Sequence, residues 1–213
     1  MSIAAGEMVS IVGPSGSGKS TLLYCLAGLE GVDSGSVRIA GEDLAGASPQ
    51  RLAAIRQRHM GFVFQSYNLI PSLTALQNVE LPARLARRRV AAGEAEAALA
   101  AVGLAEVAHS RPPFLSGGQQ QRVAIARAIF SKPDVVFADE PTGALDANAS
   151  RGVLDLLRGV SDAGSAVLMV THDLEAAART DRALVIRDGA LHSELVRPTA
   201  ADVLDALSRT QAV

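Results

Sequence analysis

A glycine-rich stretch that ends in a lysine and two hydroxyl residues is the part of the sequence best suited to bind phosphate. Glycines let the backbone curl so that successive N–H groups form a nest for an anion at the start of a helix. We expect Lys19 to reach the β- and γ-phosphates of a nucleotide, Ser20 to offer its hydroxyl to Mg²⁺, and Thr21 to add a phosphate contact. The predicted phosphate loop consists of Gly13, Pro14, Ser15, Gly16, Ser17, Gly18, Lys19, Ser20 and Thr21.

Two acidic residues, Asp139 and Glu140, follow a run of four apolar residues, Val135 to Ala138. Such a run predicts a buried strand, and ligands of open α/β sheets bind at the carboxyl ends of the strands. Asp139 could hold the shell of a Mg²⁺ ion through water, and Glu140 could polarise the water that attacks a γ-phosphate. A solvated strand end is the weaker alternative once a phosphate loop lies on the same sheet.

Ser116, Gly117, Gly118 and Gln119 begin a further predicted helix. Ser116 and Gln119 have the spacing of a capping box, which is a purely structural explanation. Each glycine, however, disfavours a helix by about 1 kcal/mol relative to alanine. A phosphate docked at this helix start would explain both the glycines and the cap.

The elements that must position these residues follow from the hydrophobic pattern. Strands are expected at Met8 to Val12, Gly61 to Phe64, Val135 to Ala138 and Ala166 to Val170, and they alternate with helical segments. This alternation is typical of an α/β fold with a mostly parallel sheet covered by helices on both faces.

Other elements complete the expected fold. A peripheral antiparallel strand is expected around residues 37–39, and Asp188-Gly189 predicts a hairpin near the end of the chain. Helices are expected at residues 22–29, 48–59, 73–85, 93–102, 116–130, 147–163 and 202–209. The stretch from Ser66 to Phe114 contains helical patterns and no clear strand, which predicts a helical subdomain inserted between strands.

The composition limits the possible classes of protein. Hydrophobic residues make up 48% of the 213 residues, which is enough for a substantial core and excludes a disordered or collagen-like chain. A net charge of −2 argues against a dedicated nucleic-acid binder. The single cysteine, Cys25, cannot form an intramolecular disulfide, which fits a reducing compartment. Only Lys19 and Lys132 are lysines among the 20 basic residues, so the lysine of the phosphate loop stands out.

No segment approaches the roughly 20 apolar residues that a membrane-spanning helix needs, and no signal peptide precedes the first strand. We therefore expect no direct membrane insertion. Arg84, Arg87, Arg88 and Arg89 form a short basic cluster, which we interpret as a solvated helix end. Contact with anionic lipid headgroups is the alternative.

Taken together, these motifs resemble those of the ATP-binding cassette (ABC) ATPases. Leu115 to Gln119, followed by Gln120 to Ala128, looks like the signature segment of that family. The phosphate loop, Gln65, Asp139-Glu140, Gly143 to Asp146 and His172 stand in the family's order, and the resemblance covers nearly the whole chain. Residues 62–70 resemble in particular the lipoprotein-releasing and macrolide-export subgroup.

The resemblance implies a single nucleotide-binding domain over residues 1–213. A RecA-like core of the P-loop NTPase type would comprise 1–65 and 132–213, and a helical subdomain with the signature would comprise 66–131. A reduced antiparallel β subdomain is also expected. Two copies would dimerise head to tail around two ATP molecules, each nucleotide touching Lys19 and Ser20 of one copy and Ser116, Gly118 and Gln119 of the other.

The remaining site residues take their roles from the same resemblance. Gln65 would join the Mg²⁺ and water shell, Asp146 would lie at the dimer seam, and His172 would contact the γ-phosphate and orient Glu140. Without the family pattern, the structural explanations prevail: Gln65 as a polar strand end, Asp146 as a helix cap and His172 as a structural histidine.

The implied function is ATP hydrolysis coupled to transmembrane permease subunits, for export or lipoprotein release. The chain would then lie in the cytoplasm, on the inner face of the membrane. The segment from Ser66 to Leu73 could line a groove for a cytoplasmic helix of the permease, or be buried within the helical subdomain. The alternatives are a soluble non-transport ABC ATPase and a truncated nucleotide-binding module with little turnover.

In one respect the sequence departs from the family pattern. No aromatic residue precedes the Met8 strand, so a ring that stacks on adenine is expected to be missing. By analogy with base stacking in nucleic-acid binders, this would weaken ATP binding about tenfold or more. The strand at residues 37–39 would also have an exposed edge. The hypothesis is a truncated or wrongly set start of the reading frame.

Overall fold

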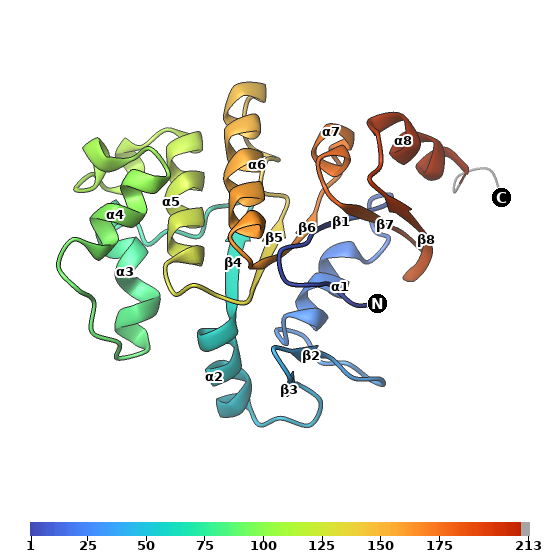
Figure 1. Ribbon diagram of the computed structural model, residues 1–213, viewed down its shortest axis with the longest axis horizontal. Helices are drawn as coiled ribbons and strands as arrows, with labels where there is room; N and C mark the ends of the chain where they lie inside the picture. The colour runs from blue at the N-terminus through green and yellow to red at the C-terminus, as the bar shows by residue number, and fades with distance from the viewer. Residues whose placement is uncertain (210–213) are drawn as a thin grey trace.

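The computed structural model describes residues 1–209 and shows one six-stranded sheet with helices on both faces (Figure 1). The strand order is β4-β5-β6-β1-β7-β8. All neighbouring strands are parallel except β7 and β8, which form an antiparallel hairpin. The strands of this sheet are β1 (Met8–Val12), β4 (Met60–Phe64), β5 (Val135–Asp139), β6 (Ala166–Val170), β7 (Arg182–Arg187) and β8 (Ala190–Val196).

The helices are α1 (Lys19–Leu26), α2 (Pro49–His59), α3 (Ala75–Leu85), α4 (Glu94–Ala101), α5 (Gly117–Ile129), α6 (Ala147–Asp162), α7 (Leu174–Ala178) and α8 (Ala200–Arg209). Short 3₁₀ turns cover Ala105–Val107 and Pro112–Phe114. The mostly parallel sheet and the helical segment between β4 and β5 agree with the predicted fold class. A separate two-stranded antiparallel sheet, β2 (Arg38–Ile39) with β3 (Glu42–Asp43), provides the small β unit.

Alternate residues of the central strands pack on opposite faces, which explains why these strands read as continuous apolar runs. Val135 and Phe137 of β5 join a cluster with Leu23 of α1 on one face. Val136 and Ala138 join a cluster on the other face, with side chains from α5 and α6. The sheet is therefore fixed between α1 and the α5–α6 pair.

Helices α3, α4 and α5 form a group beside the sheet (Figure 1) with a core of its own. Helix α5 belongs to both parts: Val123 and Ala126 face the helical core, and Ile125 faces the sheet. The sequence predicted this inserted helical segment from the absence of strands. Helix α5 thus joins the helical group to the sheet.

The helix after the phosphate loop differs from its predicted bounds of 22–29. It begins at Lys19, directly after Gly18, which has a left-handed backbone with φ 91°. It ends before Gly28, whose φ of 61° stops a helix without the strain that a Cβ atom would bring. Lys19 and Ser20 consequently lie in the first turn of α1, where the free backbone N–H groups are.

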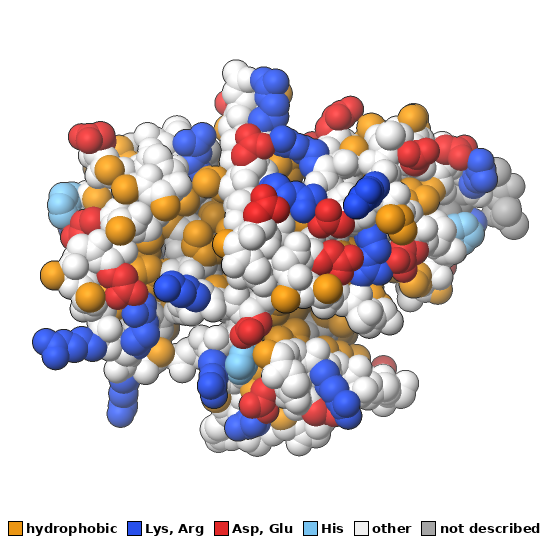
Figure 2. All heavy atoms as spheres, viewed as in Figure 1, with side chains coloured by type: hydrophobic (Ala, Val, Ile, Leu, Met, Phe, Trp, Pro, Cys, Tyr) orange, Lys and Arg blue, Asp and Glu red, His pale blue; other side chains and the backbone are white. Residues whose placement is uncertain are grey.

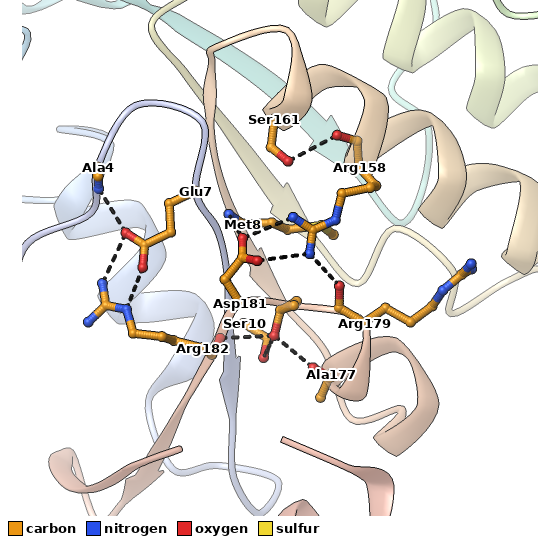
Figure 3. Close-up of polar contacts among 11 residues, drawn as sticks. Ala4, Glu7, Met8, Ser10, Arg158, Ser161, Ala177, Arg179, Asp181 and Arg182 are labelled. Atoms are coloured by element: carbon orange, nitrogen blue, oxygen red, sulfur yellow. Dashed lines mark hydrogen bonds and ion pairs between the residues drawn. The ribbon is translucent and has the colours of Figure 1, made fainter. Parts of the chain in front are cut away.

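Ion pairs fix the amino ends of β1 and β7 (Figure 3). Arg182 binds Glu7, with Nε 2.5 Å from Oε1, and also Glu194, with Nη1 2.6 Å from Oε1. Arg158 of α6 binds both carboxylate oxygens of Asp181, at 2.9 and 3.2 Å. Asp181 also accepts the Met8 amide at 2.8 Å.

These contacts shift the pKa values of the charged groups. Burial alone would raise the pKa of Glu7, but hydrogen bonds from Arg182 and the Ala4 amide, with the Arg182 charge, bring it below its usual range. The pKa of Asp181 is lowered in the same way, against the effect of burial, by Arg158 and the Met8 amide. Hydrogen bonds to Glu7 and Glu194 raise the pKa of Arg182. The amino edge of the sheet therefore holds its charges in matched pairs.

Candidate functional site

The phosphate loop connects β1, in the middle of the sheet, to α1, so it lies at the carboxyl edge of the strands. Gly16 and Gly18 have φ values of 78° and 91°, a left-handed backbone that favours glycine. The Lys19 ammonium donates to the carbonyl oxygens of Gly13 and Pro14 at 3.0 and 2.7 Å. The ammonium group of Lys19 therefore lies against the carbonyl oxygens of its own loop.

Ser17 adds a buried polar atom to this loop. Its Oγ has no hydrogen-bond partner within residues 1–209, and its carbonyl oxygen accepts the Gly189 amide from the β7–β8 turn at 3.2 Å. A buried hydroxyl without a partner is uncommon, because its desolvation is not compensated. The loop therefore has spare capacity to bind a polar ligand.

Asp139, at the end of β5, meets two hydroxyl groups of α1. Ser20 Oγ donates to Oδ1 at 3.0 Å, and Tyr24 Oη donates to Oδ2 at 2.6 Å. Together with burial and the carboxylate charge, the hydrogen bond to Asp139 raises the pKa of Tyr24 to about 12. The sequence analysis predicted Ser20 and Asp139 but missed Tyr24. The four-residue spacing of Ser20 and Tyr24, one helical turn, is the signal that could have found it.

The hydroxyl and carboxylate oxygens of Ser20 and Asp139 are the hard donors that Mg²⁺ prefers. Their separation of 3.0 Å shows that both oxygens reach one point beside the phosphate loop. These residues therefore fit a Mg²⁺ ion bound together with a nucleotide. Among residues 1–209, no group of three or more His, Cys, Asp or Glu side chains could hold a metal ion without such a ligand.

Glu140 has a strained backbone and a buried carboxylate oxygen that lacks a hydrogen bond among the described residues. Its φ of 48° is rare for a residue with a side chain, and such strain persists where the surrounding structure imposes it. Its amide donates to the Val170 carbonyl at 3.0 Å, which ties it to the end of β6. His172, two residues beyond β6, brings Nδ1 to 2.9 Å from Glu140 Oε2. This contact lacks hydrogen-bond geometry, so Oε2 is buried without a hydrogen bond among the described residues.

Gln65 follows β4, the neighbour of β5, and is exposed. Its amide lies close to Gly143, where a Cβ atom would come within 3.0 Å of Gln65 Nε2. The Gly143 amide in turn donates to the Glu140 carbonyl at 3.1 Å. The side chain of Gln65 is thus placed beside the turn that follows the two acidic residues.

The segment after Gln65 is attached to α5. Tyr67 and Asn68 have φ values of 60° and 49°, and Arg127 of α5 donates to both of their carbonyl oxygens, at 2.9 and 2.5 Å. Burial lowers the pKa of the Arg127 guanidinium. The Tyr67 hydroxyl lies against the start of α5, 2.9 Å from where a Cβ atom on Gly117 would be. A larger residue at position 117 would therefore have to displace the Tyr67 hydroxyl.

Two helix starts form a second part of the candidate site. Ser116 and Gln119 make the predicted capping box, in which each side chain accepts the other residue's amide. Asp146 caps α6, accepting the amides of Asn148 and Ala149. Both starts line one open hollow, whose walls are Ser116, Gly118, Gln119, Arg122, Asp146, Ala147, Asn148 and Ala149. A Cβ atom on Gly118 would lie 3.1 Å from Ala149 Cβ, so this glycine allows α5 and α6 to approach.

The predicted site residues therefore fall into two groups. Lys19, Ser20 and Asp139 meet at the phosphate loop, with Glu140 and His172 at neighbouring strand ends. The second group lines the hollow between the starts of α5 and α6 and consists of Ser116, Gly118, Gln119 and Asp146. Within the part of the chain that the structure describes, no hydrogen bond or ion pair joins the phosphate loop to this hollow. The fold and the phosphate loop together define a nucleotide-binding α/β protein.

Comparison with known proteins identifies the family. The sequence model of the family described as "ABC transporter" matches residues 1–143. The chain belongs to this family, whose ATP-binding units hydrolyse ATP.

Curated relatives include two proteins named "Macrolide export ATP-binding/permease protein MacB". The protein from Chromobacterium violaceum is 47% identical over 98% of this chain and 32% of its own length. The protein from Shigella flexneri is 45% identical over 100% of this chain and 33% of its own length. The chain therefore spans about a third of the length of these relatives.

Solved structures agree with the sequence comparisons. A dimeric post-hydrolysis state of the ATP-binding cassette MJ0796, bound to ADP and Pi, has a TM-score of 0.85 and 40% identity, covering 93% of this chain and 88% of that one. Another dimeric structure of MJ0796, a bacterial ABC transporter cassette, has a TM-score of 0.83 and 42% identity, with the same coverage of both chains. No helix within residues 1–209 is both long enough and apolar enough to span a bilayer.

Proposed function

We propose that two copies of this chain enclose two ATP molecules head to tail and pass the energy of hydrolysis to a transmembrane permease. The separation of the two groups of site residues carries this proposal. The phosphate loop and the hollow between α5 and α6 share no hydrogen bond or ion pair in the described part of the chain. Two helix starts with no ligand in their own chain would meet the nucleotide of a second copy. The dimeric MJ0796 structures support this arrangement.

Within each site, we assign the phosphate contacts to the loop from Gly13 to Thr21. Lys19 would balance the charge of the β- and γ-phosphates. Ser20 and Asp139 would hold Mg²⁺, which supplies charge neutralisation on the phosphate oxygens when it is bound. From the second copy, Ser116, Gly117, Gly118 and Gln119 would contribute a helix start to the γ-phosphate, and Asp146 would lie at the seam.

Hydrolysis needs a water molecule aligned with the γ-phosphate and a group that accepts its proton. Glu140 Oε2 has a free hydrogen-bonding position, so it would accept the proton as the water oxygen bonds to phosphorus and the bond to ADP breaks. His172 lies 2.9 Å from that oxygen and would orient it. Gln65 would contribute to the shell of water and Mg²⁺ and report the presence of the γ-phosphate.

The remaining assignments concern the whole assembly. The names of the MacB relatives pair ATP binding with a permease and with macrolide export, which supports export as the direction of transport.

We propose that residues 1–65 and 132–213 form the nucleotide-binding core and 66–131 the helical subdomain. The chain would then lie on the cytoplasmic face of the membrane, held there by its permease. The macrolide-exporter names of the relatives do not favour a soluble, non-transport ATPase.

Mixing two defective variants tests the shared site. Lys19→Ala removes the phosphate-loop cation. Ser116→Asp keeps a side-chain cap for α5 but places a negative charge where phosphate would dock. Each variant alone is expected to lose ATPase activity. In a head-to-tail mixed dimer, the intact loop of one copy faces the intact Ser116 of the other, so activity should return in part.

Ser48→Asp is the matched control, because Ser48 also caps a helix, α2, away from both groups of site residues. It should leave the ATPase rate of the wild type unchanged. Absence of any recovery on mixing, with mixed dimers present by sedimentation, would contradict a site shared between two copies, as would full activity of Ser116→Asp alone.

A further inference from the structure

Tyr24 of α1 lies beside Asp139, at the carboxyl end of β5, although none of the sequence motifs contains this tyrosine. It lies four residues after Ser20 in α1, so both side chains leave the same face of the helix. Each hydroxyl group binds a different carboxylate oxygen of Asp139. Ser20 Oγ donates to Oδ1 at 3.0 Å, and Tyr24 Oη donates to Oδ2 at 2.6 Å. Both oxygens of this carboxylate are therefore bound by one helix.

The second hydrogen bond has a specific geometric effect. The terminal torsion of an aspartate side chain has broad minima, so one hydrogen bond leaves the plane of the carboxylate free to turn. Bonds to both oxygens fix this plane. The Tyr24 ring packs against the apolar cluster that includes Leu23 and Phe137, which holds the phenol in place.

We propose that Tyr24 is a positioning residue that orients Asp139 for Mg²⁺. This inference rests on the proposed roles of Ser20 and Asp139 in holding the metal. Tyr24 itself does not touch the ion. Its hydroxyl donates a hydrogen bond to Oδ2, so that Oδ1 stays directed at Ser20 and at the metal position beside the phosphate loop.

Binding of a fluorescent, non-hydrolysable ATP analogue at increasing free Mg²⁺ tests this role without relying on turnover. Tyr24→Phe keeps the packed ring and removes only the hydroxyl. We expect the Mg²⁺ concentration for half-maximal binding to rise by about threefold to tenfold, the usual effect of losing one intramolecular hydrogen bond. Binding in excess EDTA should stay the same.

Cys25→Ala is a matched control on the same helix. It also removes a side-chain donor, but the Cys25 thiol reaches the Gly31 carbonyl rather than Asp139. Its Mg²⁺ requirement should equal that of the wild type. An unchanged requirement in Tyr24→Phe would overturn the inference. A lower one would also overturn it, because it would show that the phenol competes with the metal.

Asp139→Asn separates this inference from the proposed function. If Asp139→Asn leaves the Mg²⁺ requirement unchanged, the proposed metal role of Asp139 fails and the inference falls with it. If Asp139→Asn raises the requirement while Tyr24→Phe does not, only the role of Tyr24 is wrong.

Tyrosine fluorescence gives an independent readout of the contact. The sequence has two tyrosines and no tryptophan, so Tyr67→Phe leaves Tyr24 as the sole emitter. A carboxylate bound to a phenol quenches its emission. In this background, Asp139→Asn should brighten Tyr24, and unchanged emission would show that the hydrogen bond is absent in solution.

Discussion

The two ends of the parallel strands differ in how completely their buried polar side chains are paired. At the amino edge, Arg182 and Glu7 satisfy each other, and their side chains are only 18% and 19% exposed. At the carboxyl edge, Glu140 Oε2 and Ser17 Oγ are buried and form no hydrogen bond with any of residues 1–209. A buried polar atom without a partner costs stability, so the carboxyl edge bears a cost that the amino edge avoids.

This difference separates residues that hold the fold from residues that await a ligand. The amino edge joins the segment before β1 to α6 and β7 through closed ion pairs. At the carboxyl edge, we propose that the unused hydrogen-bonding capacity serves phosphate, metal and water. On the face in Figure 2, acidic and basic side chains are interspersed over the surface. At the carboxyl edge, the incomplete pairing of buried polar atoms marks the candidate site.

The largest expected effect is at Glu140. Glu140→Gln keeps the size of the side chain but removes the proton acceptor, so the ATPase rate should fall by about 10²–10⁴-fold while nucleotide binding is retained. Phosphate release and nucleotide binding measure the two effects separately. Glu106→Gln, at an exposed position in the helical segment, is the control and should change neither. Equal rates for wild type and Glu140→Gln would remove Glu140 as the base.

A smaller loss is expected at His172, which we propose to act through Glu140 and which is itself 69% exposed. His172→Ala should lower the ATPase rate by about 10–100-fold, as is usual for a group that orients a catalytic residue. Steady-state kinetics should show the loss in kcat. The exposed His109 is the matched control, and His109→Ala should have the wild-type rate. A larger loss in His172→Ala than in Glu140→Gln would contradict the proposal that His172 acts only by orienting Glu140.

At the amino edge, the expected effect is on stability instead. Arg182→Met leaves Glu7 and Glu194 without their partner and should lower the free energy of unfolding by about 1–2 kcal/mol. Urea unfolding measures this change. Arg209→Met breaks an exposed pair with Asp205 and should change stability by less than about 0.5 kcal/mol. A fall in ATPase rate per folded molecule of Arg182→Met would contradict the separation between the two edges.

The smallest effect is a pH dependence. In the folded state the pKa of Glu7 lies below its ordinary value of 4.5, and that of Asp181 below 3.8. The unfolded state therefore binds more protons in this range, and stability falls as pH drops below these ordinary values. Urea unfolding between about pH 6 and about pH 3 should show this loss. Glu7→Gln should flatten the curve, and Glu106→Gln should leave it as in the wild type.

Sequence patterns predicted the fold well, because parallel strands are buried on both faces and therefore appear as short apolar runs. The sequence also indicated the phosphate loop and the caps at Ser116 and Asp146, because these features depend on residues close together in the chain. Helix α1 begins at Lys19 rather than at Leu22 because the loop glycines, not the apolar pattern, set its start.

Contacts between distant segments were beyond sequence reasoning. Glycines at 117 and 118 suggested a docked phosphate, yet Tyr67 and Ala149 come within 2.9 and 3.1 Å of the positions that their Cβ atoms would take. The protein's own packing thus favours small residues at both positions before any ligand binds. Tyr24 was missed for the same reason, since its partner Asp139 is 115 residues away in sequence.

The contact between Tyr67 and α5 also has a mechanical consequence. Arg127 of α5 donates hydrogen bonds to two successive carbonyl oxygens of the segment after Gln65. The Tyr67 hydroxyl of this segment lies next to Gly117, in the first turn of α5. Because of these contacts, a displacement of the segment around Tyr67 is expected to move the first turn of α5 with it, since closely packed elements do not slide freely past each other.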